Sequence, residues 1–132
     1  MPFKMSSFIF WSGVYNGVLA SILLFPPLYH ALGLNICAPA LGWLLSGFLA
    51  YTSVVLIFAA KDVPRRAALV YWEALLRWVA ALVLIPAGLF GDLGAIAALL
   101  GLGDLTIGMI YALGLTTELK LSHRALLFDR FD

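Results

Sequence analysis

The stretch Tyr71–Pro86, "YWEALLRWVAALVLIP", places Glu73 and Arg77 four residues apart within an otherwise apolar run. The run is continuous and not alternating, which favours a transmembrane helix over a strand of a membrane barrel. Charged side chains are costly in hydrocarbon unless they face the interior of a helix bundle and are paired there. The stretch therefore predicts a transmembrane helix that carries a shielded ion pair.

The composition of the whole chain agrees with a membrane environment. Hydrophobic residues make up 64% of the chain and charged residues 11%, and the mean hydropathy is +1.04. A soluble globule of this composition would lack the charge to stay in solution. Four apolar runs, at about residues 8–25, 39–59, 67–89 and 94–115, are each long enough to cross a bilayer as a helix. We predict an all-α, four-transmembrane-helix bundle that forms a single membrane domain over residues 1–132.

The distribution of Lys and Arg predicts the orientation of this bundle. Apart from Arg77, the basic residues lie before the first run, between the second and third, and after the fourth: Lys4, Lys61, Arg65, Arg66, Lys120, Arg124 and Arg130. The positive-inside rule then places both termini in the cytoplasm, including an amphipathic tail at residues 116–132. The lone Cys37 falls on the outer side.

The two halves of the chain resemble each other faintly. "LLFPPLYHALG" at 23–33 is similar to "VLIPAGLFGDLG" at 83–94, and "LGWLLSG" at 41–47 is similar to "LGDLTIG" at 102–108. A tandem duplication of a helical hairpin would produce this spacing, and two tandem hairpins are one form of the predicted bundle. Small residues also recur at four-residue spacing, as Gly13, Gly17 and Ser21 in the first run and Gly42, Ser46 and Ala50 in the second. Such stripes favour close helix packing within the bundle, with homo-oligomerisation as the alternative.

Depth along the helices predicts which charges meet. At 1.5 Å per residue, Glu73 lies roughly 9 Å and Arg77 roughly 15 Å from the cytoplasmic entry of the third span, while Asp104 lies about 15 Å from the outer end of the fourth. Arg77 and Asp104 thus share a level, and Glu73 lies on the Arg77 face of its helix. We predict that Glu73, Arg77 and Asp104, here called the charge cluster, meet at the centre of the bundle. Other polar side chains reach similar depth: Tyr15 and Asn16 in the first run, Tyr51 and Thr52 in the second, and Tyr111 in the fourth. Of these, Asn16, Tyr51 and Tyr111 are our candidates to join the cluster.

The charge cluster has several interpretations. An Arg between two acids can lock helix register without any ligand. The excess of two acids over one base also leaves a carboxylate for a cationic or hydrogen-bonding guest, which indicates a site for a small molecule, a lipid or a quinone. An ion or proton pathway is a third interpretation, limited by the apolar character of the outer half of the bundle.

Catalytic and cofactor motifs are not found. His30 and His123 are expected on opposite sides of the membrane, so no metal or haem site is expected. No nucleophile has a plausible His base, and neither basic group has the size of a nucleic-acid footprint. We therefore expect no cofactor, no metal, no nucleic-acid partner and no autonomous enzymatic activity.

The order of four short spans, with a Pro-terminated first helix, "YWEALLRW" at 71–78 and "LGDLTIGMIY" at 102–111, resembles small bacterial inner-membrane proteins of the broad DoxX-like four-helix type. The resemblance is one of architecture, and no functional residue is transferred through it. It implies a protein of the bacterial cytoplasmic membrane that is accessory to a larger enzyme system. The sequence thus predicts an accessory subunit, or a protein that binds a small hydrophobic or cationic ligand through the charge cluster. A minimal transporter or proton-linked channel built from homo-oligomers is the alternative.

Overall fold

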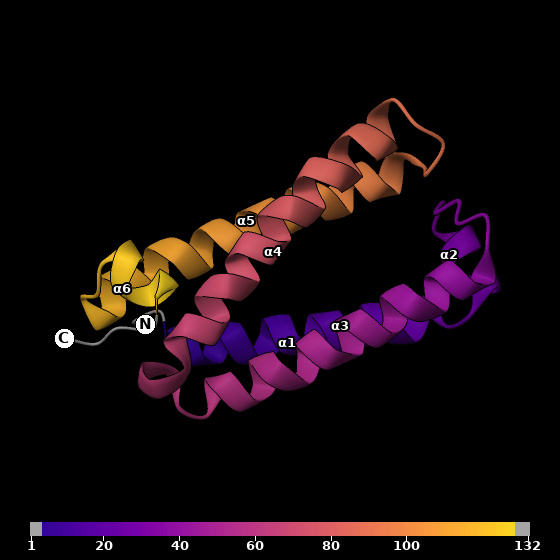
Figure 1. Ribbon diagram of the computed structural model, residues 1–132. Coiled ribbons are helices and arrows are strands. Elements are labelled where there is room, and N and C mark those ends of the chain that lie inside the picture. Colours follow the sequence, from indigo (N-terminus) through magenta and orange to yellow (C-terminus); the bar gives the residue numbers. More distant parts are fainter. Residues whose placement is uncertain (1–3, 129–132) are drawn as a thin grey trace.

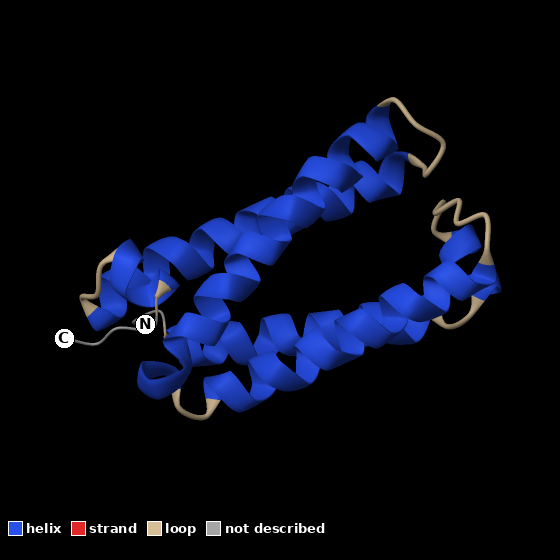
Figure 2. Ribbon diagram, viewed as in Figure 1, coloured by secondary structure: helices blue, strands red, loops and turns tan. Residues whose placement is uncertain are grey.

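The computed structural model describes residues 4–128, which consist of helices and loops without a strand (Figures 1 and 2). Within this range the helices are α1 (Met5–Leu23), α2 (Pro26–Ala31), α3 (Pro39–Ala60), α4 (Val63–Leu89), α5 (Ala95–Leu119) and α6 (His123–Leu127). The predicted all-α class is confirmed.

Within the described part of the chain, four helices, α1, α3, α4 and α5, are long and apolar enough to cross a membrane. Their outward surfaces carry large apolar side chains, among them Trp11, Phe48 and Leu82, which a soluble protein would not display in such number. The chain is a multi-pass membrane protein built as a four-helix bundle.

Each predicted span is shorter than the observed helix, and the difference is largest for α4 and α5. The fourth helix, α5, continues to Leu119, four residues past its predicted end, and α4 begins at Val63 instead of at 67. Hydropathy marks only the apolar part of a helix, whereas backbone hydrogen bonding continues through polar residues at its ends. The first predicted span is observed as α1, which covers Met5–Leu23 in place of 8–25. The second is observed as α3, which agrees with its prediction within one residue.

Local sequence explains several helix ends. Pro26, Pro39 and Pro64 lie in the first turns of α2, α3 and α4, where the missing backbone N–H is not needed. At the other end of the chain, α5 stops at Lys120, whose backbone adopts the left-handed conformation with φ 55°. The turn at Lys120 redirects the chain toward α6.

The helices pack as two tandem hairpins, one formed by α1 and α3 and the other by α4 and α5 (Figure 1). In the first hairpin, Gly13 lies directly against α3 and accepts a hydrogen bond from Ser53 Oγ at 2.6 Å. Ser46 Oγ donates to the Ala20 carbonyl of α1, also at 2.6 Å. Small residues thus serve helix packing within the bundle, but Ser21 of the predicted first stripe is exposed and donates to the Gly17 carbonyl of its own helix.

One member of the predicted stripe on the second span is misplaced. Gly42 and Ser46 are buried against α1, but Ala50 is exposed, and Ser53 occupies the next buried position. The contact line along α3 therefore advances by three residues from Ser46 to Leu49 and then by four to Ser53, because a helix with 3.6 residues per turn cannot keep a strict four-residue stripe on one face.

In the second hairpin, glycines of α5 lie against bulky side chains of α4. A Cβ atom on Gly108 would lie 2.7 Å from Trp78 Nε1, and one on Gly101 would lie 2.8 Å from Ile85 Cγ1. Both positions are buried, so the two helices approach more closely than a larger residue would permit.

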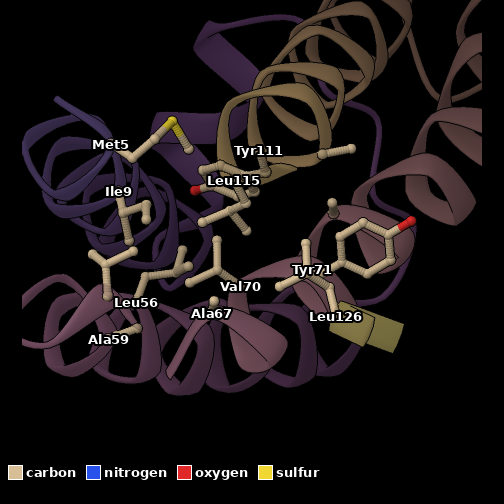
Figure 3. Packing of buried hydrophobic residues seen from close by; sticks show 13 residues of the cluster. Met5, Ile9, Leu56, Ala59, Ala67, Val70, Tyr71, Tyr111, Leu115 and Leu126 are labelled. Carbon is tan, nitrogen blue, oxygen red and sulfur yellow. The ribbon is translucent and has the colours of Figure 1, made fainter. Parts of the chain in front are cut away.

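The two hairpins meet at both ends of the bundle. At the end where Lys4, Lys61 and Lys120 lie beside the ends of α1, α3 and α5, here called the basic end, buried side chains from both hairpins form one cluster (Figure 3). At the opposite end, here called the loop end, Leu34 and Ile36 belong to a second cluster with Ala97 of α5. A hydrogen bond of 2.8 Å from Asn35 N to Leu93 O also joins the two hairpins there. Between these ends the hairpin axes diverge (Figure 1).

The C-terminal segment folds back onto α4. Leu126 of α6 is buried in the basic-end cluster (Figure 3), Tyr71 OH lies 3.0 Å from His123 Nδ1, and Trp72 Nε1 donates to the Leu127 carbonyl at 2.9 Å. The predicted tail at 116–132 is therefore corrected in two respects over the described residues. Residues 116–119 belong to α5, and the apolar side of α6 packs on α4. Arg130 and residues 129–132 lie outside the described residues.

Candidate functional site

Arg77 of α4 is the centre of the polar interior. Its guanidinium is 4% exposed and donates through Nη1 to Asp104 Oδ1 of α5 at 2.7 Å. Its Nη2 donates to Asn16 Oδ1 of α1 at 2.9 Å, and its Nε lies 3.7 Å from Glu73 Oε1. The charge cluster predicted from depth is thus present in the structure, with Asn16 beside it.

The planar shape of the guanidinium explains why an Arg occupies this position. Its two terminal nitrogens point toward different helices, so a single side chain contacts Asp104 within its own hairpin and Asn16 in the other. The ammonium group of a Lys is a point charge without this fixed fork. Glu73 lies one turn before Arg77 on α4, where an acid is expected to pair with a base four residues later.

Asn16 extends the network to the remaining helix. Its Nδ2 donates to Thr52 Oγ1 of α3 at 3.0 Å, and Thr52 Oγ1 in turn donates to the Leu49 carbonyl. One connected set of hydrogen bonds therefore includes side chains from α1, α3, α4 and α5. In hydrocarbon, a network of this kind satisfies groups that water would otherwise solvate.

Tyr111 forms a second polar link between the hairpins. Its side chain is fully buried, its ring lies 5.6 Å from Arg77 Cζ, and its hydroxyl is hydrogen-bonded to Ser12 Oγ. Because the Ser12 hydroxyl donates to the Ile9 carbonyl at 2.8 Å, Tyr111 is the donor in its bond with Ser12. The ring face of Tyr111 also offers a cation–π contact to the guanidinium.

Tyr51 does not join the cluster, and the prediction that included it is wrong. Its side chain is 70% exposed on the outer surface of α3. Tyr51 has the right depth, but each helical residue rotates the side-chain direction by about 100°, and the inward position belongs to its neighbour Thr52. At this level of α3, Thr52 is the residue that contacts Asn16.

Ser12 is the site residue that the sequence interpretation missed. It lies four residues before Asn16 on α1, and this spacing places both side chains on one helical face. The pair of polar residues at that spacing in an apolar run is a signal that could have identified Ser12.

The two carboxylates are less completely enclosed than the guanidinium. The side chain of Asp104 is 17% exposed and that of Glu73 is 10% exposed, against 4% for Arg77. Among the described residues, Asp104 accepts its hydrogen bond through Oδ1 alone. With both acids ionised, the cluster carries one more negative than positive charge, so it can accept a proton or a group that donates hydrogen bonds.

The described residues do not form a metal-binding site. Between residues 4 and 128, no group of three His, Cys, Asp or Glu side chains is close enough to hold an ion. His30 lies at the loop end and bonds the Leu34 carbonyl, whereas His123 lies at the basic end on Tyr71.

Comparisons of the chain with protein-family models, with curated proteins and with solved structures gave no match. The fold and the site therefore define the class of protein: a small multi-pass membrane protein with a polar network at the centre of four helices.

Proposed function

We propose that this protein is a small accessory or ligand-binding membrane protein, and that it binds a small ligand at the charge cluster. Its proposed location is the bacterial cytoplasmic membrane, which the resemblance to DoxX-like proteins supports. The basic residues at the basic end, among them Lys4, Lys61 and Lys120, support an orientation with both chain ends in the cytoplasm.

One observation carries the proposal of a ligand site. Asp104 uses Oδ1 for Arg77 and retains an exposed fraction of 17%, although it lies on a membrane-spanning helix. A cluster that served packing alone would gain from enclosing both acids as fully as it encloses Arg77, because partly paired charge is costly in hydrocarbon. In this proposal, the remaining acceptor capacity of Asp104 binds the ligand.

The chemistry of the cluster limits the ligand. A partner for the spare carboxylate must donate hydrogen bonds or carry positive charge, as an amine or a hydroxyl group does. The surroundings of the cluster are apolar helices, so the rest of the ligand is apolar and reaches the site from the lipid phase. Small amphiphiles, including lipids and quinols, belong to this class.

Asp104→Asn is the variant that tests this proposal. Asparagine keeps the oxygen that accepts from Arg77 but removes the negative charge, so the fold should persist while a cationic or hydrogen-bond-donating ligand is lost. Glu118→Gln is the matched control, since Glu118 is an exposed acid on the same helix. The measurement is native mass spectrometry of protein purified in mild detergent, with thermal unfolding recorded in parallel.

We expect an additional small-molecule mass on the wild type and on Glu118→Gln, and its absence from Asp104→Asn at nearly unchanged thermal stability. Equal ligand mass on all three proteins would contradict the proposal. Loss of the fold in Asp104→Asn, with no ligand on the wild type, would instead support a role in helix register.

Transport remains the second candidate, and the apolar clusters at the two ends of the bundle rank it lower. Leu23, Leu34 and Ile36 fill the loop end, so the polar side chains of the interior do not continue to that surface. Proton-linked flux through reconstituted vesicles that disappears in Asp104→Asn but not in Glu118→Gln would reverse this order.

A further inference from the structure

Two surface grooves at the basic end lie apart from the charge cluster. One, of about 440 Å³, runs between α3 and α4 and is lined by Val55, Phe58, Ala59, Lys61, Arg66 and Leu69. The other, of about 310 Å³, runs between α1 and α3 and is lined by Ser6, Ser7, Phe10, Ile57, Ala60 and Lys61. Lys61 lines both grooves, so a group bound to Lys61 has an apolar channel on either side.

The polar rim of the α3–α4 groove is positively charged. Lys61 Nζ lies 5.3 Å from the centroid of the Phe58 ring, and Arg66 Nη1 donates to the Phe58 carbonyl at the end of α3. These contacts hold both cations over the same residue. The carboxylate next in sequence, Asp62, is paired with Arg65 at 3.8 Å and does not line either groove.

Both cations retain unused donors. Arg66 uses one of its five N–H groups to donate to the Phe58 carbonyl. The ammonium of Lys61 makes no hydrogen bond among the described residues. Both side chains are exposed. An anion placed between them would therefore meet several free N–H donors at the level where α3 leaves the membrane.

The walls of the α3–α4 groove are apolar and extend into the span. Val55 lies six residues before Lys61 on α3, which corresponds to about 9 Å along the helix axis. Phe58 and Leu69, on α3 and α4, are both exposed side chains that face this space. The groove thus combines a cationic rim with an apolar channel along the direction in which acyl chains run.

We propose that this groove is a binding site for an anionic phospholipid. The phosphate of the headgroup binds Lys61 and Arg66, and an acyl chain follows Val55, Phe58 and Leu69 along the groove. Charge complementarity identifies the occupant, because basic pockets between transmembrane helices select lipids with net negative charge. The second groove accommodates the other chain, with the hydroxyl groups of Ser6 and Ser7 near the headgroup. The site does not depend on the ligand proposed for the charge cluster.

The test is a titration of the full-length protein, in detergent, with phosphatidylglycerol and with phosphatidylcholine of the same acyl chains. Native mass spectrometry measures the lipid-bound fraction, and inorganic phosphate and glycerol 3-phosphate serve as headgroup probes without chains. Each basic residue near a headgroup contributes about fivefold in affinity, so Lys61→Gln with Arg66→Gln should weaken phosphatidylglycerol binding roughly 25-fold. Lys120→Gln with Arg124→Gln is the matched control, which removes the same charge from the same end away from both grooves.

Leu69→Trp provides an independent variant, because it fills the apolar channel at an exposed position without changing charge or the hydrogen bond of Arg66. We expect it to lower phosphatidylglycerol binding at unchanged thermal stability, and Lys61→Gln alone to do so about fivefold. Equal binding of the two lipids, an equal loss in the control pair, or saturation by inorganic phosphate or glycerol 3-phosphate alone would each overturn the proposal.

Discussion

Arg77 donates to Asn16 across the boundary between the two hairpins, over 2.9 Å, while the same guanidinium pairs with Asp104 inside its own hairpin. A single side chain thus completes the charge pairing of one hairpin and ties it to the other. Along α1, Asn16 lies between Ile9 of the basic-end cluster and Leu23 of the loop-end cluster, so the tie acts between the two apolar contacts of the hairpins.

Replacing Arg77 by Leu should destabilise the fold strongly. Glu73 and Asp104 would lose their base in a nearly enclosed site, and a buried pair broken on one side typically costs roughly 3–5 kcal/mol. The triple replacement of all three charges by Leu should recover much of this loss, because no unpaired charge remains. Unfolding of the reconstituted protein in denaturing detergent measures both effects. Arg65→Leu, at a position that is 86% exposed, is the control and should change stability little.

Tyr111→Phe tests the polar link between the hairpins, and Tyr51→Phe is its matched control. Tyr111→Phe removes the donor to Ser12 and should lower the free energy of unfolding by about 0.6 kcal/mol, the average for hydrogen bonds between membrane helices. Tyr51→Phe changes an exposed side chain and should have no measurable effect. Equal effects of the two substitutions would show that the Ser12 contact does not link the hairpins.

Alanine substitutions at two glycines of α5 distinguish the cost of overpacking, at Gly108, from the gain in helix propensity, at Gly103. Gly108→Ala would place its Cβ 2.7 Å from Trp78 Nε1 and 3.1 Å from the Ala74 carbonyl, and overpacking of this kind costs roughly 1–3 kcal/mol. Gly103→Ala meets no atom within 4 Å and should be neutral or stabilising by up to about 1 kcal/mol. The measurement is thermal unfolding of the two variants in the same detergent, and a stabilising Gly108→Ala would contradict the observed approach of α4 and α5.

Cys37, the single cysteine of the chain, permits a direct test of orientation because it is exposed at the loop end. A membrane-impermeant maleimide should label Cys37 in intact cells. Thr117→Cys in a Cys37→Ser background, at an exposed position at the basic end, should be labelled only after lysis. The reverse pattern would place the basic end outside and would remove the support that charge distribution gives to a cytoplasmic location of both chain ends.

The membrane class and the meeting of the three charges could be predicted because both depend on position along the chain. Hydropathy identifies the spans. The constant rise per residue of a helix then places Arg77 and Asp104 at the same depth, and the 2.7 Å contact between them agrees with this. The face of each helix was harder to predict. Tyr51 and Thr52 differ by one residue and point in different directions, and only the line of contact between α1 and α3 decides which of them faces inward.

The end of the chain shows a second reason for incomplete prediction. The spacing of Leu119, Leu126 and Leu127 indicates an amphipathic segment, and amphipathicity does not identify the surface that the apolar face covers. Leu126 is fully buried on the basic-end cluster, since the left-handed turn at Lys120 brings α6 back onto α4. The left-handed conformation of Lys120 cannot be predicted from the spacing of apolar residues. The sequence pattern therefore does not show whether the apolar face of this segment packs on lipid or on the protein.

The arrangement of the pairs also bears on how the chain enters the bilayer during synthesis. Glu73, Arg77 and Asp104 all belong to the second hairpin, so that hairpin can partition into lipid with Arg77 already paired to its acids and without help from α1. The first hairpin brings only neutral polar groups, such as Asn16 and Ser53. We therefore expect each hairpin to insert as one unit, with the Arg77–Asn16 bond forming when the two inserted units associate.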